Sequence, residues 1–268
     1  MAGEVLAPLR ARYALWLGLD GEQVLQDRAE AAQDVRALQL LVRMERDRPP
    51  SWHRALALAA SGSAAICLDP RSEPGGEWND AVRAYCAGHI RKVTRRGRGA
   101  GWEATADLPG ITLTDGGTEV RALVPGRVED LDRQVGKLQV GGTDVEPDEA
   151  PAPASGPVLR IWLPPEPRMT LGKAMAQTGH AGMIAAALLT ADQPRLERWR
   201  AAGLSAAVNR ADHRMWRELS AAFADDGDAW SNNRLLAVRD AGFTEVAPGT
   251  ITAVAGIDWE SAPSSFNC

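Results

Sequence analysis

A segment without apolar periodicity divides the sequence into two blocks of similar length. Residues 141–156 read GGTDVEPDEAPAPASG and combine Gly, Pro and Ala with acidic residues. This composition is typical of an exposed linker, because it provides no apolar face that could be buried. We therefore predict two folded domains, at residues 35–140 and 157–260.

The two blocks carry similar motifs in the same order. Each has an apolar strand, a Pro-rich loop, a helix of small residues and a Thr-Glu-Val segment that reaches a Pro-Gly turn. The strand, the helix and the Thr-Glu-Val segment begin near Leu38, Arg54 and Thr118 in the first block and near Leu159, Lys173 and Thr244 in the second. The pattern in each block is strand, helix, helix, strand, strand, as expected for helices that cover a mixed sheet. We predict an α/β fold, with a mixed β-sheet flanked by helices, in two tandem copies that form a pseudo-dimer.

The ends of the chain lie outside this repeat. Apolar residues between Val5 and Trp16 recur near helical spacing, and a second such run follows a Gly-Leu-Asp-Gly break. Residues 1–34 are therefore predicted to be a helical appendage. Residues 261–268 are predicted to be a tail, and the sequence does not explain it.

Composition narrows the class of protein. The chain is 45% hydrophobic and 24% charged, which is ordinary for a soluble globular protein. Its apolar runs are shorter than a membrane span, and the N-terminus lacks the pattern of a secretory leader, so we expect a cytoplasmic location. Cys67, Cys86 and Cys268 show no CxxC spacing, and the four histidines form no HxxxH pair. We expect no metal and no cofactor.

One basic cluster stands out against the formal net charge of −5, which argues against nucleic-acid affinity along the whole chain. Its members are Arg91, Lys92, Arg95, Arg96 and Arg98. Such a run is either a solvated loop or a local nucleic-acid contact.

The second block contains a polar stripe on a helix of small residues. Lys173, Gln177 and His180 follow one another at spacings of four and three, which places them on one helical face. Thr170 is the predicted N-cap. Lys173 near the helix N-terminus would favour a phosphate or a developing oxyanion, although a solvated lysine at a helix start is the simpler interpretation for Lys173 alone.

A second polar group follows near the end of this block. The run from Asn232 to Gly242 is predicted to be a helix that ends at Gly242, so that Asp240 would face the negative end of the helix dipole. Lys173 is the cation that we expect to neutralise Asp240. Thr244 and Thr252 fall on the following strand-turn-strand, where they either orient water or simply reflect the preference of threonine for strands.

Two separated motifs resemble a known family. GKAMAQTGHA at 172–181 and DAGFTEVAPGTITAVAG at 240–256, together with the Trp199 to Gly203 spacing between them, resemble the signature of peptidyl-tRNA hydrolases of the archaeal and eukaryotic type. The resemblance covers nearly all of the second block. It implies a compact mixed sheet flanked by helices, no metal, and hydrolysis of the ester that joins a peptide to the 3′ end of tRNA. Carried over by position, the site residues would be Lys173, Gln177, His180, Asp240, Thr244 and Thr252.

The chain departs from the family pattern at several places. Phe243 and Glu245 stand where the family usually has Arg and Gln, which makes the surroundings of the site more negative. In the first block, Arg54, Leu58 and Ser61 replace the lysine, glutamine and histidine, so we interpret this block as inactive. Because family members commonly pair as homodimers, the first block could serve as a built-in partner that supplies its basic cluster to tRNA.

The mechanism that we predict is direct attack of water on the peptidyl ester. Asp240, oriented by Lys173, would position or deprotonate the water, and threonine hydroxyls or helix N–H groups would stabilise the oxyanion. His180 is either a proton carrier or a packed, hydrogen-bonded residue. Two alternatives stay open: acyl transfer from aminoacyl- or peptidyl-tRNA to an amine, and a non-catalytic tRNA-binding module.

Overall fold

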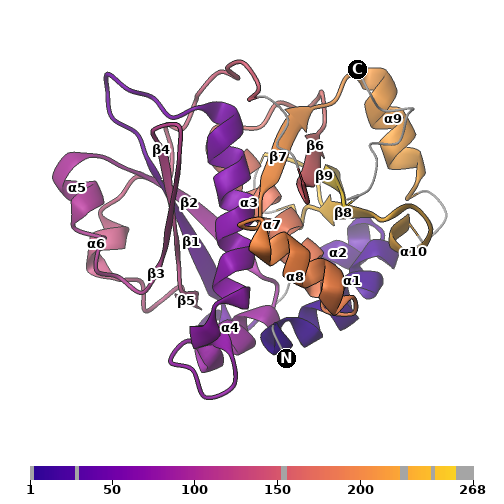
Figure 1. Cartoon of the computed structure of the whole chain (residues 1–268), viewed down its shortest axis with the longest axis horizontal. Helices are drawn as coiled ribbons and strands as arrows, with labels where there is room; N and C mark the ends of the chain where they lie inside the picture. Colours follow the sequence, from indigo (N-terminus) through magenta and orange to yellow (C-terminus); the bar gives the residue numbers. More distant parts are fainter. Residues whose placement is uncertain (1–2, 28–29, 152–155, 224–228, 243–244, 258–268) are drawn as a thin grey trace.

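The computed structural model of the chain describes residues 3–27, 30–151, 156–223, 229–242 and 245–257. Within these residues, none of the helices has the length and apolar character needed to cross a membrane. Figure 1 shows two β-sheets on opposite sides of a central pair of helices, α3 and α7.

The N-terminal unit is built around a mixed sheet. Its strands are β1 (Arg36–Arg43), β2 (Arg91–Gly97), β3 (Gly110–Asp115), β4 (Thr118–Leu123) and the short β5 (Gly126–Arg127). The main order is β2-β1-β4-β3, with β1 parallel to β2 and antiparallel to β4. The helices are α3 (Trp52–Leu68), η3 (Pro70–Ser72), α4 (Asn79–Cys86), α5 (Gly99–Glu103) and α6 (Arg133–Gly136).

The C-terminal unit repeats this topology. Its strands are β6 (Leu159–Leu163), β7 (Ala206–Arg210), β8 (Leu235–Arg239) and β9 (Ile251–Gly256), in the order β7-β6-β9-β8. The helices are α7 (Leu171–Leu189), α8 (Gln193–Ala201), α9 (His213–Ala221) and α10 (Ala229–Asn233). As in the first unit, the first strand is parallel to the second and antiparallel to the last, so the two units have equivalent strand orders.

The predicted fold class, a mixed sheet flanked by helices in two similar units, is confirmed. The predicted pattern contained three strands in each block, whereas four strands form the main path of each sheet. In the first unit the additional strand is β2, which contains most of the basic cluster. Arginine and lysine side chains alternate there between the two faces of a strand that pairs with the buried strand β1, so tertiary pairing has overridden a charge run that looked like a loop.

The N-terminal segment that we predicted to be an appendage is helical. It consists of η1 (Glu4–Leu6), α1 (Ala7–Gly18), α2 (Gly21–Asp27) and η2 (Ala32–Asp34), with the predicted break between α1 and α2. Leu6 and Leu9 are fully buried. The Tyr13 hydroxyl accepts a hydrogen bond from Ala237 N at 2.8 Å and lies 3.3 Å from Ala237 O. Because β8 is an edge strand, this contact covers backbone groups that would otherwise be open to another strand.

Small residues bring α3 and α7 into close contact. A Cβ at Gly182 would lie 2.2 Å from Ala60 O, so only glycine fits against the backbone of α3. One turn earlier, a Cβ at Gly179 would lie 2.8 Å from Lys92 Cδ. Thr178 Oγ1 donates a hydrogen bond to Leu56 O at 3.0 Å. The small residues on the predicted polar helix therefore serve the packing between the two units.

Residues 141–151 are largely exposed, but one part of this segment is not. Thr143 is 2% exposed and lies against the start of α7. Its carbonyl accepts from Leu171 N at 3.2 Å, and its Oγ1 accepts from Gly172 N at 3.1 Å. The segment after the N-terminal unit thus packs on the helix that carries the predicted site.

Candidate active site

A buried ion pair joins the two motifs of the C-terminal unit. Lys173, in the first turn of α7, donates to Asp240 Oδ2, and both side chains are less than 10% exposed. The same oxygen accepts from Gln177 Nε2 at 2.8 Å, and Asp240 Oδ1 accepts from Gly242 N at 2.7 Å. Both carboxylate oxygens are thus fixed by donors.

The predicted helix before Asp240 is wrong. Asp240 follows strand β8, and α10 ends at Asn233. The apolar run from Leu235 to Val238 is short enough to suit either a helix or a strand, and antiparallel pairing with β9 decides in favour of the strand. The dipole penalty expected at a helix C-terminus therefore does not apply. Gly242 does adopt the left-handed conformation, with φ of 73°.

Thr252 and Gln177 extend the polar chain. Thr252, on β9, donates from Oγ1 to Gln177 Oε1 at 2.6 Å, and it is 1% exposed. With its oxygen engaged by Thr252, the Gln177 amide must present its NH₂ group to Asp240. The order Thr252, Gln177, Asp240, Lys173 is a continuous hydrogen-bonded chain. Thr244, predicted as a further member, lies outside the described residues, as does Phe243.

His180 lies one turn beyond Gln177 and meets a residue of the N-terminal unit. Its Nδ1 is 3.4 Å from Lys92 Nζ, on β2. Burial lowers the pKa of His180 well below its usual range, and the charges of Lys92 and Lys173 lower it further. Burial also lowers the pKa of Lys92 to about 7. The neutral forms of the His180 imidazole and the Lys92 amine are therefore more favoured here than in water.

The N-terminus of α7 does not offer free N–H groups. Lys173 N donates to the N-cap Thr170 Oγ1 at 3.3 Å, and Leu171 N and Gly172 N are held by Thr143. Thr170 N and Thr170 Oγ1 donate to the Glu245 carboxylate at 3.2 and 2.9 Å. Glu245 therefore occupies the place at which we expected a phosphate or an oxyanion to bind.

The N-terminal unit has an equivalent pair at its surface. Ser51 caps α3 as Thr170 caps α7, and Arg54 N donates to Ser51 Oγ at 3.2 Å. Arg54 Nη1 contacts Asp115 Oδ1 at 2.6 Å, but these side chains are 31% and 55% exposed. Ser61, at the position of the histidine, donates to Leu204 O at 2.8 Å and so belongs to the packing between the units.

The basic cluster divides between the interior and the surface. Lys92 lies in the wall of the site, and Arg91 pairs with Glu30. Arg95 donates to Gln39 Oε1 and Leu138 O, both at 3.0 Å, so it is part of the sheet's own hydrogen bonding. Arg96 contacts Gln139, and Arg98 is exposed. The five residues do not form one surface patch.

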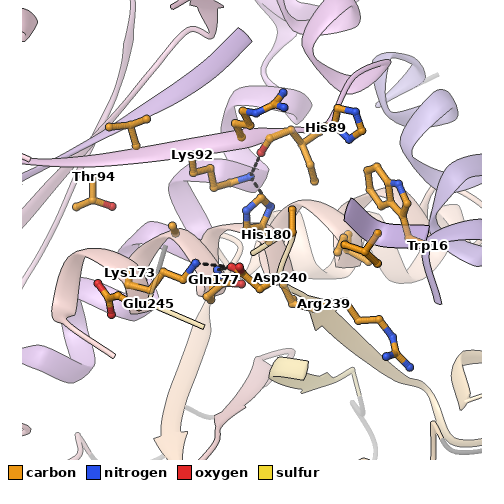
Figure 2. Close-up of a pocket in the computed structure, with 18 of the residues that line it drawn as sticks. Trp16, His89, Lys92, Thr94, Lys173, Gln177, His180, Arg239, Asp240 and Glu245 are labelled. Carbon is orange, nitrogen blue, oxygen red and sulfur yellow. Dashed lines mark hydrogen bonds and ion pairs between the residues drawn. The ribbon is translucent and has the colours of Figure 1, made fainter. Parts of the chain in front are cut away.

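A cavity of about 430 Å³ contains this chemistry. In Figure 2, Lys92 reaches from β2 towards the His180 ring, while Lys173 and Gln177 point towards Asp240. The remaining walls come from the appendage, the linker and β8, with Trp16, Val24, Thr143 and Val238 among the lining residues. Its volume suits a ligand larger than water or a single ion. Within the described ranges, no group of three or more His, Cys, Asp or Glu side chains is placed to hold a metal ion.

Sequence reasoning missed the roles of Lys92 and of the appendage. If residues 91–97 are interpreted as a strand, alternation places Lys92 and Thr94 on one face, and both contact α7, Thr94 through a 2.8 Å hydrogen bond to Gly172 O. That alternation is the signal that would have found Lys92. We know of no signal in the sequence that would place Trp16 beside the site.

Comparison with known proteins agrees with the geometry. The family peptidyl-tRNA hydrolase PTH2 matches residues 158–258, which is less than half of the chain and includes Lys173, Gln177, His180 and Asp240. Searches of curated proteins and of solved structures found no match. Residues 158–258 of this chain are therefore similar to the peptidyl-tRNA hydrolase PTH2 family.

Proposed function

We propose that the protein hydrolyses the ester bond between a peptide, or an N-blocked aminoacyl group, and tRNA. The observation that carries the proposal is the buried chain of Thr252, Gln177, Asp240 and Lys173, which opens into a cavity large enough for an acyl group. The family match supports the same activity.

Asp240 is the proposed base. Its carboxylate is held in place by Lys173, Gln177 and Gly242 N, so that it can orient a water molecule and accept a proton as the water attacks the ester carbonyl. The bond between water oxygen and carbonyl carbon forms, the bond to the tRNA 3′ oxygen breaks, and that oxygen takes up the proton. The products are a free carboxylic acid and tRNA.

Stabilisation of the oxyanion needs donors other than the N-terminus of α7, because those N–H groups already have acceptors. Lys173 Nζ is the nearest cation to Asp240, and His180 lies on the same face of α7. We assign the oxyanion to Lys173, with His180 as a neutral hydrogen-bond donor. The threonine hydroxyl of Thr252 orients Gln177 and acts through it.

The N-terminal unit is proposed to be a degenerate copy that replaces a second subunit. Its topology matches that of the C-terminal unit, and its Arg54–Asp115 pair stands where the buried pair would be. Leu58 and Ser61 cannot reproduce the amide and the imidazole. The unit instead contributes Lys92 and, through Arg96 and Arg98, a positive surface for tRNA.

The test measures release of free N-acetyl amino acid from N-acetyl-aminoacyl-tRNA. Wild type should release acid and tRNA in equal amounts, and Asp240→Asn should be slower by about 10²- to 10³-fold, the size expected when a general base is lost. Asp115→Asn, the matched change in the other unit, should leave the rate unchanged. If Asp240→Asn kept the full rate, the assignment would be wrong. An amide product in the presence of amines would identify acyl transfer instead.

A further inference from the structure

The cavity changes in character along its length. Six residues of α7 line it, and four of these, Lys173, Gln177, His180 and Ile184, follow one another at spacings of four, three and four. With a rise of 1.5 Å per residue, they span about 16 Å along the helix. The stripe is polar at the start of the helix and apolar at Ile184, which is 4% exposed.

The apolar end is completed by the N-terminal appendage. Trp16 and Leu17 of α1, Leu19, and Val24 of α2 line the cavity. In Figure 2, Trp16 and His89 lie at the opposite end of the cavity from Thr94 and Glu245. The appendage thus forms a wall of the site.

Two arginines at this end are paired with carboxylates. Arg12 donates to both oxygens of Asp27 at 2.9 and 3.0 Å, Trp16 Nε1 also donates to Asp27 at 3.0 Å, and Arg91 pairs with Glu30. Because Arg12 and Arg91 already have carboxylate partners, they do not favour the binding of a phosphate at this end. Beyond the other end of the cavity, β2 continues from Thr94 towards Arg96 and Arg98. An uncharged group is therefore favoured at Ile184 and Val24.

We propose that the apolar end is an acyl pocket, which takes the side chain of the amino acid esterified to tRNA and favours large apolar or aromatic side chains. The inference rests on the proposed function, because it places the ester at Asp240. Burying a side chain of that size against Trp16, Leu19, Val24 and Ile184 would raise kcat/KM by about ten- to a hundred-fold over glycine. The appendage is then a specificity element.

The experiment uses the full chain and one tRNA body acylated with N-acetyl-Phe, N-acetyl-Leu, N-acetyl-Ala or N-acetyl-Gly. Wild type should favour Phe and Leu. Val24→Trp fills the pocket and should remove most of this preference, so that the rates for Phe and Leu fall towards the rate for Gly. Leu25→Trp is the matched control, because Leu25 is the next residue of α2, is 40% exposed and does not line the cavity. Thermal melts would show whether both variants fold.

Leu19→Ala provides an independent variant that enlarges the pocket instead of filling it. It should lower the rate for Leu and Phe substrates more than the rate for the Gly substrate. Equal rates for all four side chains in wild type, or equal losses for all four in Val24→Trp, would overturn the acyl pocket alone. If Val24→Trp instead weakened inhibition by adenosine monophosphate, the pocket would hold the terminal base, which also overturns the proposal. No release from any substrate would overturn the proposed function itself.

Discussion

Lys92 of the N-terminal unit and His180 of the C-terminal unit meet across the boundary between two sheets, with 3.4 Å between Nζ and Nδ1. Lys92 Nζ also lies 3.3 Å from Ile90 O and from the Tyr85 hydroxyl. When Lys92 is charged, its ammonium can only donate, so His180 Nδ1 then accepts and the imidazole proton is on Nε2. One unit thereby fixes the tautomer of a site residue in the other.

This contact predicts the spectroscopic behaviour of His180. In wild type its ring should be the neutral Nε2–H tautomer at about pH 6, where Lys92 is charged, because burial and the charges of Lys92 and Lys173 lower its pKa. In Lys92→Met the pKa should rise towards the ordinary value. Nitrogen shifts of the ring, assigned by loss of the signal in His180→Gln, measure this. The titrations of other histidines, such as His213, should not change, and an unchanged His180 would contradict the contact.

Lys92 also predicts a pH dependence of stability. Its pKa is lowered to about 7 in the fold, so between about pH 7 and 10 the unfolded chain binds more protons than the folded chain. The free energy of unfolding should therefore rise with pH in that window, and the penalty for burying the ammonium is complete below it. As pH rises across this range, the Tm of wild type should rise relative to the Tm of Lys92→Met. Lys137→Met, at an exposed lysine, should show no such trend.

Thr252→Val tests whether the hydroxyl acts through Gln177. Valine keeps the shape and the strand preference of threonine but leaves Gln177 Oε1 without its donor, and an unmet buried acceptor costs about 1–3 kcal/mol. The amide can then turn its oxygen towards Asp240. We expect kcat to fall by about ten-fold or more with KM little changed, as follows from a disturbed base. A change in KM alone would contradict this positioning role.

Glu245→Gln should have opposite effects in two measurements. The carboxylate stabilises the N-terminus of α7 through Thr170, so its loss should lower the unfolding free energy by about 0.3–1 kcal/mol. The same change removes a negative charge beside the site, so tRNA should bind more tightly at low salt. Thermal melts and tRNA titrations at two salt concentrations check the two signs. Weaker tRNA binding would show that the carboxylate serves recognition.

Gly182→Ala should destabilise the packing of α7 against α3, which joins the two units. The added Cβ would lie 2.2 Å from Ala60 O, and backbone on both sides has to move, which costs about 1–3 kcal/mol. Because His180 is two residues away on α7, its contact with Lys92 should weaken as well. Gly136→Ala, where the nearest atom is 3.9 Å from the added Cβ, is the control and should not destabilise. A neutral effect of Gly182→Ala would contradict the close packing of α3 and α7.

Features that depend on residue spacing within one helix or strand could be predicted from the sequence. Lys173, Gln177 and His180 share a face because a helix repeats every 3.6 residues, and Thr170 caps that helix as expected. The pairing of Lys173 with Asp240 was also predicted, although for a wrong reason, since Asp240 ends a strand. The chemistry of a carboxylate beside a lysine does not depend on the element that presents it.

The features that could not be predicted arise between elements distant in sequence. Lys92 looked like part of a surface cluster, and only the pairing of β2 with β1 turns it towards α7. Trp16 joins the site only because Tyr13 fixes α1 against β8. In the same way, Thr143 and Glu245 occupy the start of α7 from the linker and from the loop before β9. No local pattern encodes such contacts.

The close packing of α3 on α7 takes place within one polypeptide. Two separate subunits would have to find each other, and the fraction with a complete site would fall on dilution. Here the second half is always present at the effective concentration set by the linker. Lys92 therefore reaches His180 at any protein concentration. Each half is also free to change on its own, so one can keep the reactive groups while the other keeps only the surfaces that surround them.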